Sequence, residues 1–216
     1  TAPLKLTLQK GESVLVKWPV EGSDWSRIKF TADKSVDYKY YGNGANSGYT
    51  ANSAGTKGTW PAHNGEEKQL VLEAREDDTE VTVLAEEVTM ESLYGNSTLS
   101  LDSLSKGDTI LVEWYCNNSG TYRFNVSGNV ECSYYTNDEN GYINYSKSWE
   151  WQEARGGRKY ILVESLEDNT DVTITASKII RDLQVGSNVS SSIAYYDTET
   201  FTFTAPKKGQ YIFSTS

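Results

Sequence analysis

The sequence has few of the side chains that most often carry chemistry. Its 216 residues include one histidine, one methionine, two cysteines and four prolines. A single histidine, His63, cannot build a histidine-rich metal site. There is no P-loop, dinucleotide-binding fingerprint, Cys-x-x-Cys pair or Gly-x-Ser-x-Gly elbow. We therefore predict that the chain is not an enzyme and has no catalytic residues, cofactor or bound metal.

Positive charge is also scarce. Twenty Lys and Arg stand against thirty Asp and Glu, which gives a net charge of −10. Nucleic-acid binding and attachment to an anionic membrane both need clustered positive charge, so neither is predicted. No apolar stretch approaches the roughly 20 residues of a membrane span, so membrane insertion is not predicted either. A neutral or cationic partner would suit this charge.

A helical pattern is missing as well. No window of about 11 residues shows an apolar stripe of helical period, whereas several segments alternate apolar and polar residues. In the first part of the chain these predicted strands are residues 14–18, 27–30, 37–41, 69–74 and 80–85. Several short strands in about 90 residues predict an all-β fold made of β-sandwich, jelly-roll-like modules.

The sequence repeats itself. Residues 70–87 and 161–178 are identical at 7 of 18 positions, at an offset of 91 residues, and the same offset pairs Trp60 with Trp151. The front of the unit recurs three times, and Trp18, Trp114 and Phe203 occupy its last position. Such recurrence predicts tandem modules and places these three aromatic side chains in their cores.

Three units are predicted from these repeats. Residues 1–87 and 88–178 form two complete sandwich modules, and residues 179–216 form the front half of a third. A segment that short rarely folds alone. We therefore expect it to dock on the second unit, to pair with another chain or, as the favoured reading, to belong to a longer multi-domain protein. The absence of an initiator Met and of a signal peptide suits a mature or excised piece.

Two stretches resemble a known family. Residues 201–214 read FTFTAPKKGQYIFS, and residues 156–163 read GGRKYILV before a second strand at residues 171–174. These stretches are similar to the strand signatures of secreted bacterial pre-peptidase C-terminal-like domains, and the repeats also resemble carbohydrate-binding modules. The resemblance implies β-sandwiches without an active site, attached to secreted enzymes or adhesins, and hence an extracellular or cell-surface location. Residues 24–30 and the loop at 42–58 depart from the signature, so equal roles for the two units do not follow.

The two cysteines are predicted to form a disulfide. Cys116 follows the first strand of the second unit, and Cys132 lies on the strand that carries Tyr134. The first unit has no cysteine at either place. A bridge across about 15 residues would add roughly 3 kcal/mol in an oxidising compartment. Two reduced thiols on strands are the alternative.

A calcium loop is only weakly indicated. Residues 137–143 read NDENGYI, which is similar to the middle of such a loop. The first ligand position is Thr or Tyr, and no bidentate Glu follows at the required spacing. A β-turn accounts for the Asn-Gly pair equally well.

The aromatic residues carry the functional prediction, because a glycan site needs flat aromatic faces with amides and carboxylates nearby. Trp25 and Trp149 do not recur at the offset of 91, so a shared core does not account for them. Trp149 and Trp151 would share one face of an extended strand. Residues 49–60 and 142–151 differ in length, which is typical of surface loops. The predicted carbohydrate-binding residues are Trp25, Tyr49, Trp60, Tyr142, Tyr145, Trp149 and Trp151.

We therefore predict a non-catalytic, extracellular carbohydrate-binding module that holds a polysaccharide by aromatic stacking and polar hydrogen bonds. The alternative is a structural spacer or adhesin-type repeat of a bacterial surface protein. A core position remains the alternative for Trp60 and Trp151, and burial of every Trp would favour the spacer. A hydrolase is kept as a third hypothesis, since thirty acidic residues allow many chance carboxylate pairs.

Overall fold

The computed structural model describes residues 2–19, 25–41, 51–63, 67–135, 143–186, 189 and 201–214, and within these ranges the chain forms strands and no helix. Accordingly, no helix of the described part could cross a membrane. The all-β prediction is confirmed. The strands are β1 (Leu4–Leu8), β2 (Ser13–Pro19), β3 (Trp25–Tyr41), β4 (Ala51–His63), β5 (Glu67–Ala74), β6 (Thr79–Glu87), β7 (Thr89–Tyr94), β8 (Ser97–Leu104), β9 (Thr109–Tyr115), β10 (Gly120–Val126), β11 (Val130–Tyr135), β12 (Ile143–Tyr145), β13 (Ser148–Glu153), β14 (Arg158–Ser165), β15 (Thr170–Lys178), β16 (Arg181–Leu183) and β17 (Phe201–Phe203).

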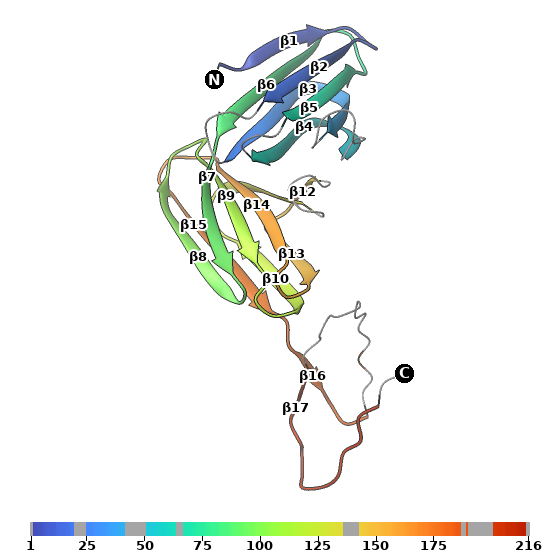
Figure 1. Ribbon diagram of the computed structural model, residues 1–216, viewed down its shortest axis with the longest axis vertical. Helices are drawn as coiled ribbons and strands as arrows, with labels where there is room; N and C mark the ends of the chain where they lie inside the picture. The colour runs from blue at the N-terminus through green and yellow to red at the C-terminus, as the bar shows by residue number, and fades with distance from the viewer. Residues whose placement is uncertain are drawn as a thin grey trace.

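Strands β1–β6, called here the N-terminal segment, form one sheet in the order β1-β6-β3-β5-β2, with β4 also paired to β3 (Figure 1). Strand β3 pairs with β6 over its first half and with β5 over its second half. The register with β4 shifts between Thr31 and Val36. An irregularity of this kind lets one strand pass from one sheet layer to another. The segment therefore folds around its own apolar core although its strands form a single connected sheet.

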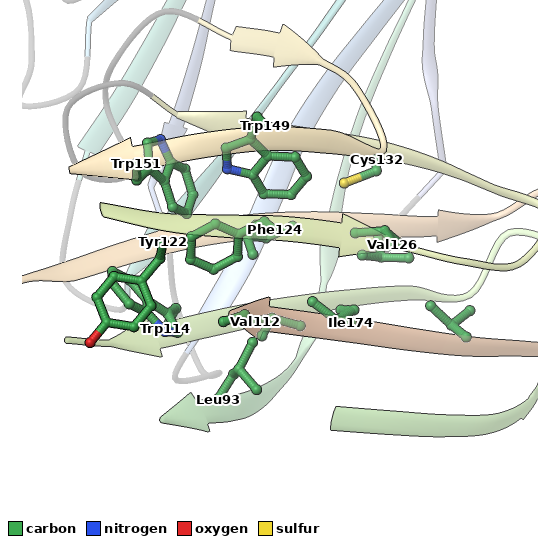
Figure 2. Packing of buried hydrophobic residues seen from close by; sticks show 14 of the residues in the cluster. Leu93, Val112, Trp114, Tyr122, Phe124, Val126, Cys132, Trp149, Trp151 and Ile174 are labelled. Atoms are coloured by element: carbon green, nitrogen blue, oxygen red, sulfur yellow. The ribbon is translucent and has the colours of Figure 1, made fainter. Parts of the chain in front are cut away.

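Strands β7–β15, called here the middle segment, form two sheets. One has the order β13-β10-β15-β8, and the other has the order β12-β11-β14-β9-β7. Their inner faces enclose a second core built from alternate residues such as Phe124, Val126 and Ile174 (Figure 2). The alternation along β10 and β15 is the pattern that the sequence indicated, since one face of each strand packs on the core.

The strand pairings of the two segments correspond. Val14 lies opposite Leu72 between β2 and β5, and Ile110 lies opposite Val163 between β9 and β14. The middle segment divides the long strands, so that β10 and β11 take the place of β3 while β12 and β13 take the place of β4. These matched registers agree with the sequence repeat. The module boundaries at residues 87 and 178 stay a prediction.

The registers correct one detail of the repeat. Ile28 lies opposite both Trp60 and Ala85, and Phe124 lies opposite both Trp149 and Ala176. Trp60 therefore corresponds to Trp149 and not to Trp151. The middle segment has two extra residues between this tryptophan and β14, which moved the sequence alignment out of step.

The described residues after Lys178, called here the C-terminal segment, include a short pair of parallel strands, β16 and β17, beyond the middle segment (Figure 1). Leu183 lies opposite Phe203 in this pair, as Leu93 lies opposite Trp114 in the parallel pair β7 and β9. The pairing is the one expected for the front of a further repeat. The side chain of Phe203 packs against Tyr211 and Phe213, with ring centroids 4.8 and 5.1 Å apart.

The predicted disulfide is wrong. Cys116 and Cys132 are free, buried thiols. The backbone N–H of Cys116 donates to Gly157, whereas Cys132 lies opposite Val163. These two partners are six residues apart along one chain, which is about 20 Å in a strand, and a disulfide needs Cα atoms within about 7 Å. Burial raises the pKa of both thiols, to about 12 for Cys132, so they stay protonated.

Candidate functional site

Trp149 and Trp151 lie inside the middle segment. Their side chains are 7% and 8% exposed and pack between the two sheets (Figure 2). The ring of Trp149 stacks on Tyr134 at a centroid distance of 4.3 Å and on Phe124 at 5.3 Å. The two tryptophans do share one strand face, as predicted, but that face is the inner one. The expectation that they present an aromatic surface to a ligand is therefore wrong.

Trp60 occupies the equivalent place in the N-terminal segment. It is fully buried and stacks on Tyr40, with centroids 4.5 Å apart and planes 10° apart. Tyr40 lies opposite Leu70 as Tyr134 lies opposite Ile161, so the same tyrosine–tryptophan stack recurs in both segments. This recurrence identifies the stack as part of the core, and the prediction of a binding role for Trp60 at the surface is wrong.

The segments expected to be surface loops are largely strands. Residues 51–58 belong to β4, and residues 148–151 belong to β13. Tyr49 and Tyr142, together with residues 137–142 of the weakly indicated calcium loop, lie outside the described residues.

Two of the predicted residues, Trp25 and Tyr145, lie at a junction between the two segments, on different sides of it. The outer face of the sheet that contains β14 carries a row of buried apolar residues, and these belong to the same core cluster as residues of the N-terminal segment. The end of the N-terminal segment formed by β3 and β4 covers this face. The junction residues from the middle segment are Leu111, Tyr135, Tyr160 and Leu162.

Trp25, at the start of β3, provides the aromatic contact of the junction. Its ring centroid lies 5.2 Å from that of Tyr160 and 5.0 Å from that of His63, which it meets edge to face. The N–H of Val88, in the connection between the segments, donates to the carbonyl of Trp25 at 3.2 Å. Trp25 is half-buried by these contacts, and it ties the connection to the interface.

A charged group lies beside this contact. Arg27 is almost fully buried, and its guanidinium pairs with Glu86 of its own segment at 2.5 Å and with Glu164 of the middle segment at 2.7 Å. Lys29 Nζ also lies 2.7 Å from Glu164. Burial raises the pKa of Glu164, but the hydrogen bonds from Arg27 and Lys29 outweigh it, and the net pKa lies below its ordinary value of 4.5. Glu164 is thus held as a carboxylate.

The far side of the junction is also closed by polar contacts. Lys57 on β4 pairs with Glu131 on β11, and its ammonium lies 4.4 Å from the ring centroid of Tyr145. The hydroxyl of Tyr135 donates to the carbonyl of Thr59 at 3.0 Å. Tyr145 remains 39% exposed, so of the predicted binding residues that are described it is the one with an open surface.

The contacts at the junction hold the two segments together. They are ion pairs between carboxylates and cations, placed around packed aromatic rings. Among the residues described, no set of three or more His, Cys, Asp and Glu could hold a metal. His63 packs edge to face against Trp25. This arrangement fixes two segments to each other.

Comparison with known proteins gives no family. No family model matches the chain, and the search of curated proteins found no match. The likeness to pre-peptidase C-terminal-like domains therefore stays an expectation.

The sequence does contain an indication that strand β14 is covered on both faces, although it is not an alternating pattern. Residues 160–163 of β14 read Tyr-Ile-Leu-Val without a polar interruption, and all four are buried. A continuous apolar run is expected where a strand is covered on both faces. The partners Arg27 and Glu164 could not be predicted, because 137 residues separate them in the sequence.

Proposed function

We propose that this chain is a structural spacer of a longer extracellular protein, in which successive β-sandwich segments pack end to end and hold a fixed orientation. The observation that carries the proposal is the buried junction. Segments joined by a single connection are expected to move relative to each other unless their interface is extensive and apolar. Here Leu111 and Leu162 belong to one cluster with the N-terminal core, and Arg27 bridges carboxylates of both segments.

The burial of tryptophan favours this function over glycan binding by the predicted residues. Trp60, Trp114, Trp149 and Trp151 are buried, and Trp18 and Trp25 are half-buried against the first core. A tryptophan platform for a sugar needs an open ring face. The aromatic content of the chain is used mainly to build cores.

The N-terminal segment presents a face like the one that the junction covers. By strand register, Leu15 corresponds to Leu111. Glu73 and Asp37, which lie opposite each other, correspond to the junction carboxylates Glu164 and Glu131. This face could therefore accept another module that presents Trp, Arg and Lys as β3 does. Repetition of the same contact would produce a stiff array.

Residual dipolar couplings of the intact chain test the proposal. Backbone amides of β1–β6 and of β8–β15 should fit one alignment tensor in a weakly aligning medium, because a rigid junction gives both segments the same average orientation. Two clearly different tensors would contradict a rigid spacer. Glu164→Ala, which removes the carboxylate shared by Arg27 and Lys29, should separate the tensors, whereas the matched variant Glu73→Ala should not.

A further inference from the structure

A row of aromatic and charged side chains crosses the outer face of the middle segment, next to the area that the junction covers. In the parallel pair of β7 and β9, Tyr94 lies opposite Tyr115, and Tyr115 lies opposite Arg158 of β14. The two tyrosine rings stack with centroids 6.0 Å apart and planes 27° apart. The guanidinium carbon of Arg158 lies 4.5 Å from the centroid of Tyr115. We call these three residues the tyrosine row.

The inner end of the tyrosine row is held in place. Arg158 Nη1 donates to Glu113 Oε1 at 3.2 Å, and the hydroxyl of Tyr160 donates to the same oxygen at 3.2 Å. Glu113 is itself buried. Since Tyr160 also packs against Trp25, the row is anchored through the junction. A fixed aromatic surface loses little conformational entropy when it binds a ligand.

The outer end of the row is open. Tyr94 lies on β7, an edge strand of its sheet, and is 55% exposed. The chain turns sharply after it at Gly95, whose N–H donates to the carbonyl of Tyr115 at 2.7 Å and whose carbonyl accepts from Trp114 Nε1 at 2.9 Å. A Cβ at Gly95 would lie 3.0 Å from Nδ2 of Asn117. The exposed amide of Asn117 therefore lies beside Gly95, which follows Tyr94 in the chain.

We propose that the tyrosine row is a binding site for a neutral polysaccharide, with one sugar ring stacked on Tyr94 and its hydroxyls within reach of the Asn117 amide. The face of an aromatic ring is electron-rich and attracts the polarised C–H groups of a sugar ring. The guanidinium of Arg158 is already paired with Glu113, so the row offers no unpaired cation for an acidic polymer. This inference does not depend on the spacer function.

A proline-rich peptide is the competing ligand, since such peptides also dock on tyrosines. That mode uses a groove between separate aromatic residues. In the tyrosine row the two tyrosine rings are stacked on each other, and the more exposed of them is Tyr94. One exposed ring, with an amide beside the next residue, suits one sugar ring better than a peptide helix.

The site is specific to the middle segment. In the N-terminal segment the positions that correspond to Tyr115 and Arg158 are Pro19 and Glu67, which lie opposite each other in the equivalent strand pair. The row is therefore not a feature that the fold itself requires, because the same fold forms without it.

Affinity electrophoresis of the intact chain tests the proposal, with soluble xylan, mixed-linkage β-glucan, starch and galactomannan as probes. At least one of these should retard the wild-type chain. Tyr94→Ala should weaken that retardation about tenfold or more, which is the loss expected of an anchor residue. Tyr94→Phe keeps the ring and should retain binding. Phe213→Ala, which removes another exposed aromatic side chain, should also retain it.

Thermal unfolding of each variant separates loss of binding from loss of fold. Tyr94 is exposed on an edge strand, so the melting temperature of Tyr94→Ala should stay close to that of the wild type. The proposal is overturned if none of the four polysaccharides retards the wild-type chain. It is equally overturned if Tyr94→Ala binds as tightly as the wild type, or if a proline-rich peptide binds at Tyr94 and the polysaccharides do not.

Discussion

Two faces of the molecule have the same strand pairing and opposite surroundings. On the N-terminal segment, Leu15 is 49% exposed and Glu73 faces solvent. On the middle segment, the corresponding Leu111 is fully buried and Glu164 pairs with Arg27. The difference arises because the N-terminal segment covers the outer face of the middle segment, while the corresponding face of the N-terminal segment stays exposed. Burial of an outer sheet face is thus decided by a neighbour that the local sequence does not describe.

Equivalent substitutions on the inner faces should destabilise the two segments to a similar extent. These substitutions are the reference for the comparison of the outer faces. Trp60→Ala and Trp149→Ala each remove a tryptophan stacked on a tyrosine in a closed core. Each should lower the free energy of unfolding by about 3–5 kcal/mol. Urea denaturation followed by circular dichroism measures it. A loss below about 1 kcal/mol in Trp149→Ala would mean that this side chain is at the surface and not in the core.

Substitutions on the two outer faces should differ in their cost to the free energy of unfolding. Comparing Leu111→Ala with Leu15→Ala measures this difference. Leu111 is enclosed by the junction, so its truncation should cost about 2–4 kcal/mol. Leu15 is half exposed, and its truncation should cost about 0.5 kcal/mol or less. Equal losses in the same denaturation experiment would show that the two faces have the same environment in solution.

The pH dependence of stability sharpens the comparison further. The pKa of Glu164 is lowered in the folded chain, so its ion pairs stabilise the fold above its ordinary pKa of 4.5, and that stabilisation is lost as the pH falls through the lowered pKa. Glu164→Gln should therefore be less stable than the wild type by about 1 kcal/mol at neutral pH. The gap should close in acid. Glu73→Gln is the control and should show almost no gap at either pH.

Much of the fold could be predicted from the sequence, because it depends on local alternation. The strands of residues 14–18, 69–74 and 80–85 follow from their pattern, and the repeat at an offset of 91 agrees with the matched registers of β6 and β15. Alternation also placed Trp149 and Trp151 on one face. Alternation alone does not show whether the face with the two Trp residues or the face with Glu150 and Gln152 is the inner one, because an edge strand accepts both kinds of residue.

The candidate sites depend on contacts that are distant in sequence. A shift of two residues between β13 and β14 hid the equivalence of Trp60 and Trp149, which made Trp149 look unique. The disulfide failed for a related reason, because Cys116 and Cys132 are close in sequence but lie at opposite ends of β14. The tyrosine row was missed because Tyr94 and Tyr115 become neighbours only through the parallel pairing of β7 with β9.

The contact between Trp25 and Tyr160 is the most direct test of the covered face, because these rings belong to different segments and lie 5.2 Å apart. Nuclear Overhauser spectroscopy of the intact chain, with both rings assigned, measures their proximity. The buried junction predicts cross-peaks between the indole protons of Trp25 and the ring protons of Tyr160. Absence of these cross-peaks, with the Trp149–Tyr134 cross-peaks present in the same spectrum, would contradict it.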